Sequence, residues 1–209
     1  MTLARIASPS LTVILALVVC LNVAPLFAQA PATPLVMTKA KVTIEGTSNV
    51  HDWTATSTTV RVARAQIATN AKGDGFWDAI VKPGVIESFE VVIPVATLTS
   101  PRSGLDKNMY KALKSDQHKE ITFRLKALTP KAAAGAFTAA GVLRVAGVER
   151  DVTLDITLGR SGQHLIVRGS TDLLMTDFGI DPPRALLGTV RSSPHVTITF
   201  ETVVSSPTT

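Results

Sequence analysis

The sequence predicts an all-β fold: an eight-stranded antiparallel barrel with one short helix between the third and fourth strands, behind an N-terminal signal peptide. Two observations predict it. Eight segments alternate apolar and polar side chains with a period of two, which is typical of strands with one buried face. Most of the connections between them are too short for the crossover helix that parallel strands need. We expect the sheet to close because closure removes exposed edges.

The strand pattern is clearest in 121–127, where Ile121, Phe123 and Leu125 fall on one face and Thr122 and Arg124 on the other. Three other segments alternate as regularly: 41–45, 151–158 and 196–200. Four more alternate less regularly and complete the predicted set: 52–62, 89–93, 137–145 and 165–173.

One segment has helical spacing instead. Ser103 precedes Asp106 by three residues, which resembles a capping box, and Leu105, Met109 and Leu113 then follow on one face. We therefore predict a short amphipathic helix here. It could act as a lid over one end of the barrel or simply plug that end, and both roles need the same residues.

Composition sets limits on function. The chain has 209 residues, enough for one domain with a sizeable core. Its single cysteine excludes a disulfide framework and a site with several thiolate ligands. The net charge of +5 is mild and scattered, so nucleic acid is not an expected partner.

The N-terminus has the pattern of an export signal. Arg5 precedes the apolar run 11–24, and Ala28-Gln29-Ala30 follows as a small-residue cleavage site. The apolar run is shorter than the roughly 20 residues of a membrane-spanning helix, and no later segment approaches that length. We predict a signal peptide over 1–30, with cleavage after Ala28 or Ala32 as alternatives, and a periplasmic or secreted protein. The barrel domain is expected over 38–204, followed by a disordered tail over 205–209.

Several motifs, in this order, are similar to those of the YceI-like family of exported barrel proteins. They are Glu45–Trp53 (EGTSNVHDW), Ile93–Leu98, Asp106–Lys114, His118–Leu125, Phe178–Pro183 and Val196–Phe200. The resemblance covers nearly all of the chain after the predicted signal peptide. Lys119 departs from the family, in which proline commonly follows this histidine; the position is a predicted turn.

The resemblance implies a lipocalin-like barrel that holds a long isoprenoid or another lipid chain in a central tunnel. Periodicity alone does not distinguish a tunnel from a packed core, and it does not say which strand face points inward. The candidate ligand-binding residues are His51, Trp53, Phe89, Val91, Met109, Phe123, Leu125, Leu143, Leu154, Ile156, Leu173, Phe178, Ile198 and Phe200.

Some of these residues have a second interpretation. His51 and Trp53 lie two apart, so they could line the tunnel mouth together, or form a core tryptophan beside a histidine bound to the backbone. Phe178 and Ile180 are expected to seal one end. Arg184 is interpreted as an exposed side chain, with contact to a phosphate head group as the alternative.

Nothing in the sequence predicts catalysis. The four histidines lack the spacing of a zinc site, and there is no G-x-S-x-G motif. We therefore predict a non-enzymatic carrier with no cofactor other than a bound lipid. The alternative is a packed barrel that binds a protein through a loop such as 69–77, where Phe76 and Trp77 are adjacent aromatics and one of the two is expected to pack inward. A homodimer is left open.

Substitution of Phe123 by Asp tests which face is interior. If Phe123 points inward, the buried carboxylate is expected to abolish folding or lipid uptake. Circular dichroism and lipid extraction measure the two outcomes. Unchanged stability and uptake would show that this strand has the opposite orientation.

Overall fold

The computed structural model describes residues 35–69 and 74–206. These residues belong to one compact unit, Thr33–Thr209, which has its own apolar cores. We therefore expect this part of the chain to fold by itself. The predicted signal peptide lies outside the described residues, as does the end of the predicted tail. Ser205, by contrast, is the last residue of a strand.

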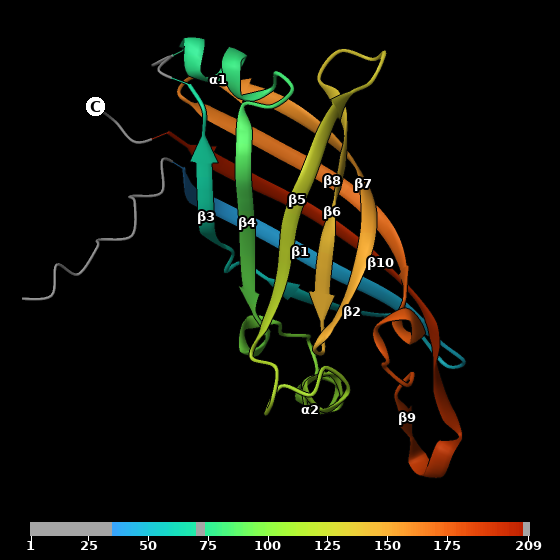
Figure 1. The fold of residues 1–209 in the computed structure, drawn as a ribbon. Helices are drawn as coiled ribbons and strands as arrows, with labels where there is room; N and C mark the ends of the chain where they lie inside the picture. Colours follow the sequence, from blue (N-terminus) through green and yellow to red (C-terminus); the bar gives the residue numbers. More distant parts are fainter. Residues whose placement is uncertain (1–34, 70–73, 207–209) are drawn as a thin grey trace, which may run out of the picture. The chain divides into compact units, whose positions relative to one another are not determined.

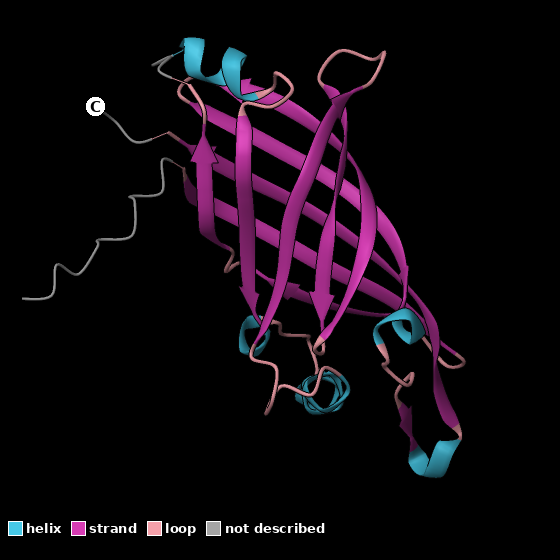
Figure 2. Cartoon of the chain, viewed as in Figure 1, coloured by secondary structure: helices cyan, strands magenta, loops and turns pink. Residues whose placement is uncertain are grey.

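The described unit is built on one antiparallel sheet that curls around an apolar interior (Figures 1 and 2). Nine strands follow one another in the order β2-β1-β10-β8-β7-β6-β5-β4-β3, and a tenth, β9, pairs only with β10. The strands are β1 (Val36–Ser48), β2 (Trp53–Ser57), β3 (Arg61–Ile67), β4 (Ile86–Pro94), β5 (Glu120–Pro130), β6 (Ala136–Val145), β7 (Val148–Ser161), β8 (His164–Leu174), β9 (Arg184–Ala185) and β10 (Val190–Ser205).

The prediction of an antiparallel all-β fold is confirmed, but the predicted count of eight strands is wrong. The segment predicted as one strand over 52–62 forms two strands, β2 and β3. Between them the chain turns, and the Ser57 hydroxyl accepts a hydrogen bond from the Thr59 N–H at 3.1 Å. Serine and threonine side chains compete for backbone groups in this way, and a Thr-rich run is therefore prone to turn.

The sheet has two edge strands, β2 and β3. In the described part of the chain no ladder joins them, so the expected closure of the sheet is wrong: the strands form a half-barrel rather than a fully paired ring. A 3-10 turn, η1 (Val95–Thr97), leads into the gap. There Thr99 forms an isolated bridge with Thr56, and the hydroxyls of Ser57 and Thr97 lie 2.7 Å apart.

The predicted helix is present as α2 (Ser103–Ala112), between β4 and β5. Its predicted capping box does not form. Arg102 is the N-cap residue and makes no side-chain cap bond, and the Asp106 carboxylate instead accepts the Ser100 N–H at 2.7 Å. Two further 3-10 turns, η2 (Met175–Phe178) and η3 (Leu186–Gly188), flank β9.

A second helix, α1 (Asp74–Ile80), was not predicted from the sequence. It occupies part of the segment proposed as an exposed protein-binding loop. Phe76 and Trp77 are both buried and pack edge to face, with ring centroids 5.1 Å apart. The proposed aromatic contact patch is therefore wrong, because these rings form part of the core.

The buried cores lie mainly at the two ends of the curled sheet. At one end, Phe76, Trp77 and Ile80 of α1 pack against Leu165 and Val204. At the other, Met109 and Leu113 from the α2 segment pack against Met175 and Phe178 of η2. The two helices close opposite ends of the sheet (Figure 1), and the space between these ends is where a site can lie.

Replacement of Trp77 by Ala tests the core at the α1 end. Its side chain is 2% exposed, so the cavity left behind is expected to lower the free energy of unfolding by about 3–5 kcal/mol. Urea denaturation measures this loss. Val36→Ala is the control: Val36 is 52% exposed, and this change should stay within about 0.5 kcal/mol. A Trp77→Ala effect as small as the control would contradict the assigned packing.

Candidate functional site: an apolar cavity in the curled sheet

The interior of the sheet contains two cavities, of about 220 Å³ and 160 Å³. The larger is bounded by Trp77 and Ile80 of α1, and the smaller by Met109 of α2. Four residues belong to both linings: Val42, Ile93, Leu143 and Ile198. The two cavities therefore meet at a common wall and form two compartments of one interior.

Both linings are almost wholly apolar. Thr202 is the one polar residue that lines the larger cavity, and Ser192 is the one that lines the smaller. No ionisable side chain of the described residues lines either cavity. Such an interior offers no hydrogen bond to a polar molecule, so it favours an apolar guest.

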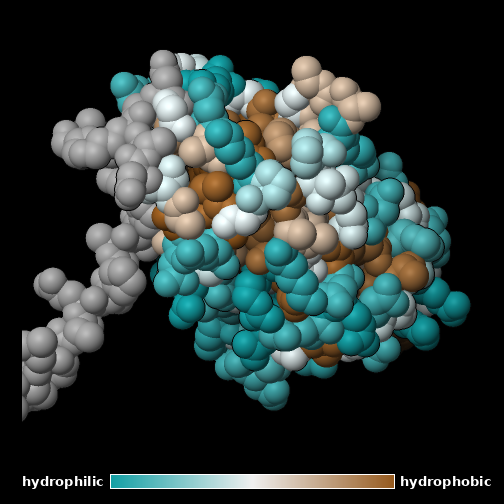
Figure 3. Space-filling view, turned by 45° about the horizontal axis from the view of Figure 1, so that its top comes forward, coloured by the Kyte–Doolittle hydropathy of each residue, from teal (hydrophilic) through white to brown (hydrophobic). Residues whose placement is uncertain are grey.

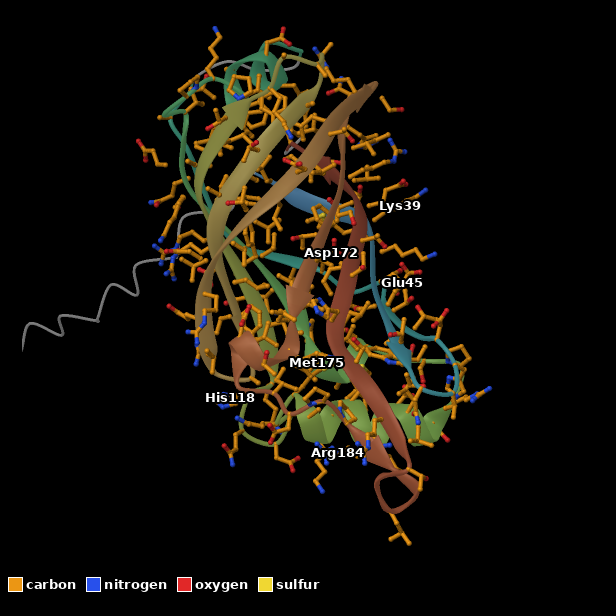
Figure 4. All side chains as sticks on the ribbon, turned by 90° about the vertical axis from the view of Figure 1, so that its right-hand side faces the viewer. Lys39, Glu45, His118, Asp172, Met175 and Arg184 are labelled. Atoms are coloured by element: carbon orange, nitrogen blue, oxygen red, sulfur yellow. The ribbon has the colours of Figure 1, made fainter. Side chains whose placement is uncertain are left out.

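Alternation along each strand sorts side chains between this interior and the outer surface. On β5, Ile121, Phe123 and Leu125 line the cavities. The residues between them point outward, and two of these form ion pairs: Arg124 with Glu149 at 4.0 Å and Lys126 with Asp151 at 2.5 Å. The structure thus gives the strand orientation that periodicity left open. Lys39 and Glu45 on β1 likewise lie on the outer side of the sheet (Figure 4).

The inner wall is only half-buried, although nearly all of it is apolar. Phe123, Leu125, Leu143, Ile198 and Phe200 are all partly accessible, because they face unfilled space. In a packed core such residues would be buried on all sides. On the face seen in Figure 3, apolar side chains are visible between hydrophilic ones. The predicted alternative of a fully packed barrel does not describe this interior.

Three aromatic rings of the wall lie directly over glycines of the neighbouring strand. A Cβ atom built on Gly169 would lie 2.4 Å from the Phe200 ring, on Gly141 2.6 Å from the Phe123 ring, and on Gly46 2.3 Å from the Trp53 ring. Phe200 is the register partner of Gly169, and Trp53 that of Gly46. The missing side chains leave room for the rings to lie along the wall, so these rings project less into the cavity.

Thirteen of the fourteen predicted ligand-binding residues line the cavities. Seven line only the larger one: Phe89, Val91, Phe123, Leu125, Leu154, Ile156 and Phe200. Leu143 and Ile198 line both, and four line only the smaller: Trp53, Met109, Leu173 and Phe178. Their contact with a ligand stays a prediction, since the structure gives their position and not their function.

His51 is placed differently. It is exposed and lines neither cavity, so it does not share the inner wall with Trp53. Its Nδ1 lies 2.9 Å from the backbone oxygen of Asp52, and its Nε2 lies 3.0 Å from a guanidinium nitrogen of Arg102. The Trp53 indole N–H donates to the backbone oxygen of Thr47 at 3.3 Å. His51 and Trp53 therefore do not form one site: the indole of Trp53 lines the smaller cavity, and the imidazole of His51 lies at the surface.

Sequence reasoning missed several wall residues. Trp77 and Ile80 lie three residues apart on α1, a helical spacing that could have indicated this second end cover. Thr202 and Val204 continue the alternation of 196–200 beyond its predicted end. Leu35 and Met37 also line the larger cavity.

The described residues show no assembly of a metal site. In 35–69 and 74–206, no three His, Cys, Asp or Glu side chains gather closely enough to hold an ion. In the same ranges, no helix has the length and apolar character needed to cross a membrane.

Substitution of Gly169 by Ala tests the ring that lies over this glycine. The added methyl group is expected to displace the Phe200 ring and to lower the free energy of unfolding by about 1–3 kcal/mol. Gly159→Ala is the matched control on β7, because nothing lies within 4 Å of the added atom there. Combining Gly169→Ala with Phe200→Leu should restore part of the loss. Denaturant unfolding that gives equal stabilities for the two glycine variants would refute the assigned contact.

Comparison with known proteins supports the same architecture. The sequence model of the YceI-like domain family matches residues 32–204 of this chain. The crystal structure of BcnA from Burkholderia cenocepacia has a TM-score of 0.60 at 14% identity, over 80% of this chain and 96% of that one. A domain from Saccharophagus degradans, described as polyisoprenoid-binding and implicated in plant cell wall breakdown, has a TM-score of 0.61 at 11% identity, over 84% and 99%.

A YceI protein from Campylobacter jejuni has a TM-score of 0.51 at 14% identity, over 72% of this chain and 85% of that one. Among curated proteins no match was found. At these identities the solved structures support the fold, and the domain match extends across the whole described sheet. The chain belongs to the YceI-like domain family.

Proposed function

We propose that this protein binds a lipid or isoprenoid chain non-covalently inside the curled sheet and acts as an exported carrier or buffer for it. The observation that carries the proposal is the hollow apolar interior, whose two compartments share the wall formed by Val42, Ile93, Leu143 and Ile198. The similar fold of a domain described as polyisoprenoid-binding supports an isoprenoid as the ligand.

The energetics favour a ligand that occupies both compartments. Burial of apolar groups contributes about 0.8 kcal/mol per methylene. Association costs about 4–15 kcal/mol in lost freedom of motion, so a short chain confined to one compartment is held weakly. A chain that passes the common wall buries more groups for the same cost. The expected ligand is therefore a slim chain of several isoprene units or a long acyl chain.

Binding of this kind needs no chemical step. The cavity linings contain no ionisable group to transfer a proton and no nucleophilic side chain apart from the hydroxyls of Thr202 and Ser192. We infer a non-enzymatic role in which apolar surface leaves water and no bond is broken. The polar head of the ligand would stay outside, near the exposed pair of His51 and Arg102, the N-cap residue of α2.

Export is the second part of the proposal. It is supported by the apolar run 11–24 and the small-residue site Ala28-Gln29-Ala30. A long apolar chain has low solubility in water, and a periplasmic or secreted binding protein would keep it in solution there.

Leu143→Phe tests whether the ligand extends through both compartments, because Leu143 is one of the four residues that line both. The larger ring is expected to narrow the space between the compartments and to lower the affinity for labelled geranylgeraniol by about tenfold. Arg144→Phe is the matched control, because Arg144 is the next residue on β6 and is exposed. Fluorescence titration measures the affinities, and mass spectrometry of lipid extracts identifies what co-purifies. Purified protein that is repeatedly empty and takes up no geranylgeraniol would refute the proposal.

A further inference from the structure

A small hairpin at the α2 end carries a fully exposed leucine. It consists of β9, the turn η3 and the start of β10, and it projects past α2 in both views (Figures 1 and 4). Leu187 lies in the turn with a relative exposure of 107% and a φ of 56°. A non-glycine residue in this left-handed conformation is strained. The turn therefore holds an apolar side chain in solvent, although the left-handed backbone conformation of Leu187 costs free energy.

A second exposed aliphatic side chain lies on a turn bound to this hairpin. Val50, in the turn between β1 and β2, is 59% exposed. Its neighbour Asn49 is hydrogen-bonded to the hairpin three times: its N–H donates to the Arg191 oxygen at 3.1 Å, its Nδ2 donates to the Thr189 oxygen at 2.8 Å, and its Oδ1 accepts the Arg191 N–H at 2.8 Å. The two exposed apolar residues thus belong to one connected surface, which we call the hairpin tip (Val50, Leu187 and the flanking Arg184 and Arg191).

The charges of the hairpin tip favour an anionic partner. Arg184 and Arg191 are register partners on β9 and β10, so two like charges stand opposite each other. Such a pair is destabilising unless a counter-charge is supplied. In the described residues neither guanidinium forms an ion pair; the Arg191 Nε donates to the backbone oxygen of Gly188 at 2.8 Å. Asp181 lies three residues before Arg184 and Asp52 two residues after Val50, so carboxylates flank the hairpin tip and its positive charge is carried by the two arginines.

The hairpin begins and ends at the wall of the smaller cavity. Pro183 and Ser192 precede and follow it in the chain, and both line this cavity. They are joined by a hydrogen bond of 3.1 Å from the Ser192 N–H to the Pro183 oxygen. The base of the hairpin is therefore part of the wall of the compartment proposed to hold the lipid chain, and the hairpin tip projects from that wall.

We propose that the hairpin tip docks reversibly on an anionic lipid bilayer, with Leu187 and Val50 in the interfacial region and Arg184 and Arg191 on lipid phosphates. Two apolar tips that project from paired turns suit insertion among headgroups, since a protein partner of ordinary size needs a broad matching surface. Basic residues beside inserted apolar ones are typical of weak, charge-dependent membrane binding. The proposal rests on the proposed function, because docking would place the cavity where its ligand enters or leaves.

The test is co-sedimentation with vesicles, using the chain from Thr33 onward so that the apolar N-terminal run does not contribute. Vesicles of phosphatidylcholine with about 30% phosphatidylglycerol are compared with phosphatidylcholine alone. The protein is expected to prefer the anionic vesicles. Leu187→Ser should weaken this partitioning by about tenfold, and Arg184→Gln by about fivefold.

Two matched controls distinguish binding through the hairpin tip from non-specific binding of exposed apolar or basic side chains to vesicles. Val36→Ser removes the other exposed large aliphatic side chain of the described residues, at the start of β1, and Arg61→Gln removes a cation paired with Glu120. Both should leave partitioning unchanged. Equal partitioning of Leu187→Ser and the unsubstituted chain, or no preference for anionic vesicles, would overturn the proposal.

A solution measurement distinguishes this proposal from the proposed function. Leu187→Ser should bind geranylgeraniol in the absence of vesicles as tightly as the unsubstituted chain, because Leu187 lines neither cavity. Loss of vesicle binding with retained geranylgeraniol binding supports docking. If the unsubstituted chain partitions to anionic vesicles through the hairpin tip but takes up no geranylgeraniol, docking holds and the proposed function fails.

Discussion

The interior of this protein depends on how its aromatic rings rest on the wall. Phe200, Phe123 and Trp53 are large enough to fill much of the space inside a curled sheet if they point to its centre. Each lies instead over a glycine of the adjacent strand, at a distance that no Cβ atom would permit. The rings therefore bury one face against backbone, and the space that they vacate is divided between the two apolar compartments.

Stability and function are separated along the length of the sheet. The buried clusters that involve α1 and α2 stabilise the two ends, where side chains from helices and strands interlock. The middle of the wall is apolar but incompletely covered, which gives up packing energy that a filled core would gain. A guest chain of the kind proposed would recover part of that packing energy.

The sequence was sufficient to predict the fold class and seven of the strands, and thirteen of its fourteen candidate residues lie in the cavity linings, because period-two alternation directly reports which side chains share a face. It failed where local chemistry competes with periodicity. At Ser57 and Thr59 a side-chain hydrogen bond turns the chain, and one predicted strand becomes two. At 74–80 a short helix buries Phe76 and Trp77, which alternation could not reveal. His51 does not share the inner wall with Trp53, because the turn before β2 interrupts the two-residue spacing; its contact with the Asp52 backbone oxygen matches the alternative interpretation of a histidine bound to the backbone.

The unpaired gap between β2 and β3 has a mechanical consequence. In a closed barrel, strand number and stagger fix the diameter, and any widening must stretch ladder hydrogen bonds all around the ring. Here widening would leave every ladder from β2 round to β3 intact, but it would disturb the Thr56–Thr99 bridge, the contact between the Ser57 and Thr97 hydroxyls, and the apolar cluster that includes Ala65 of β3, Leu35 and Val204. The width of the interior therefore depends on side-chain packing across this gap and not on a closed ring of ladder hydrogen bonds.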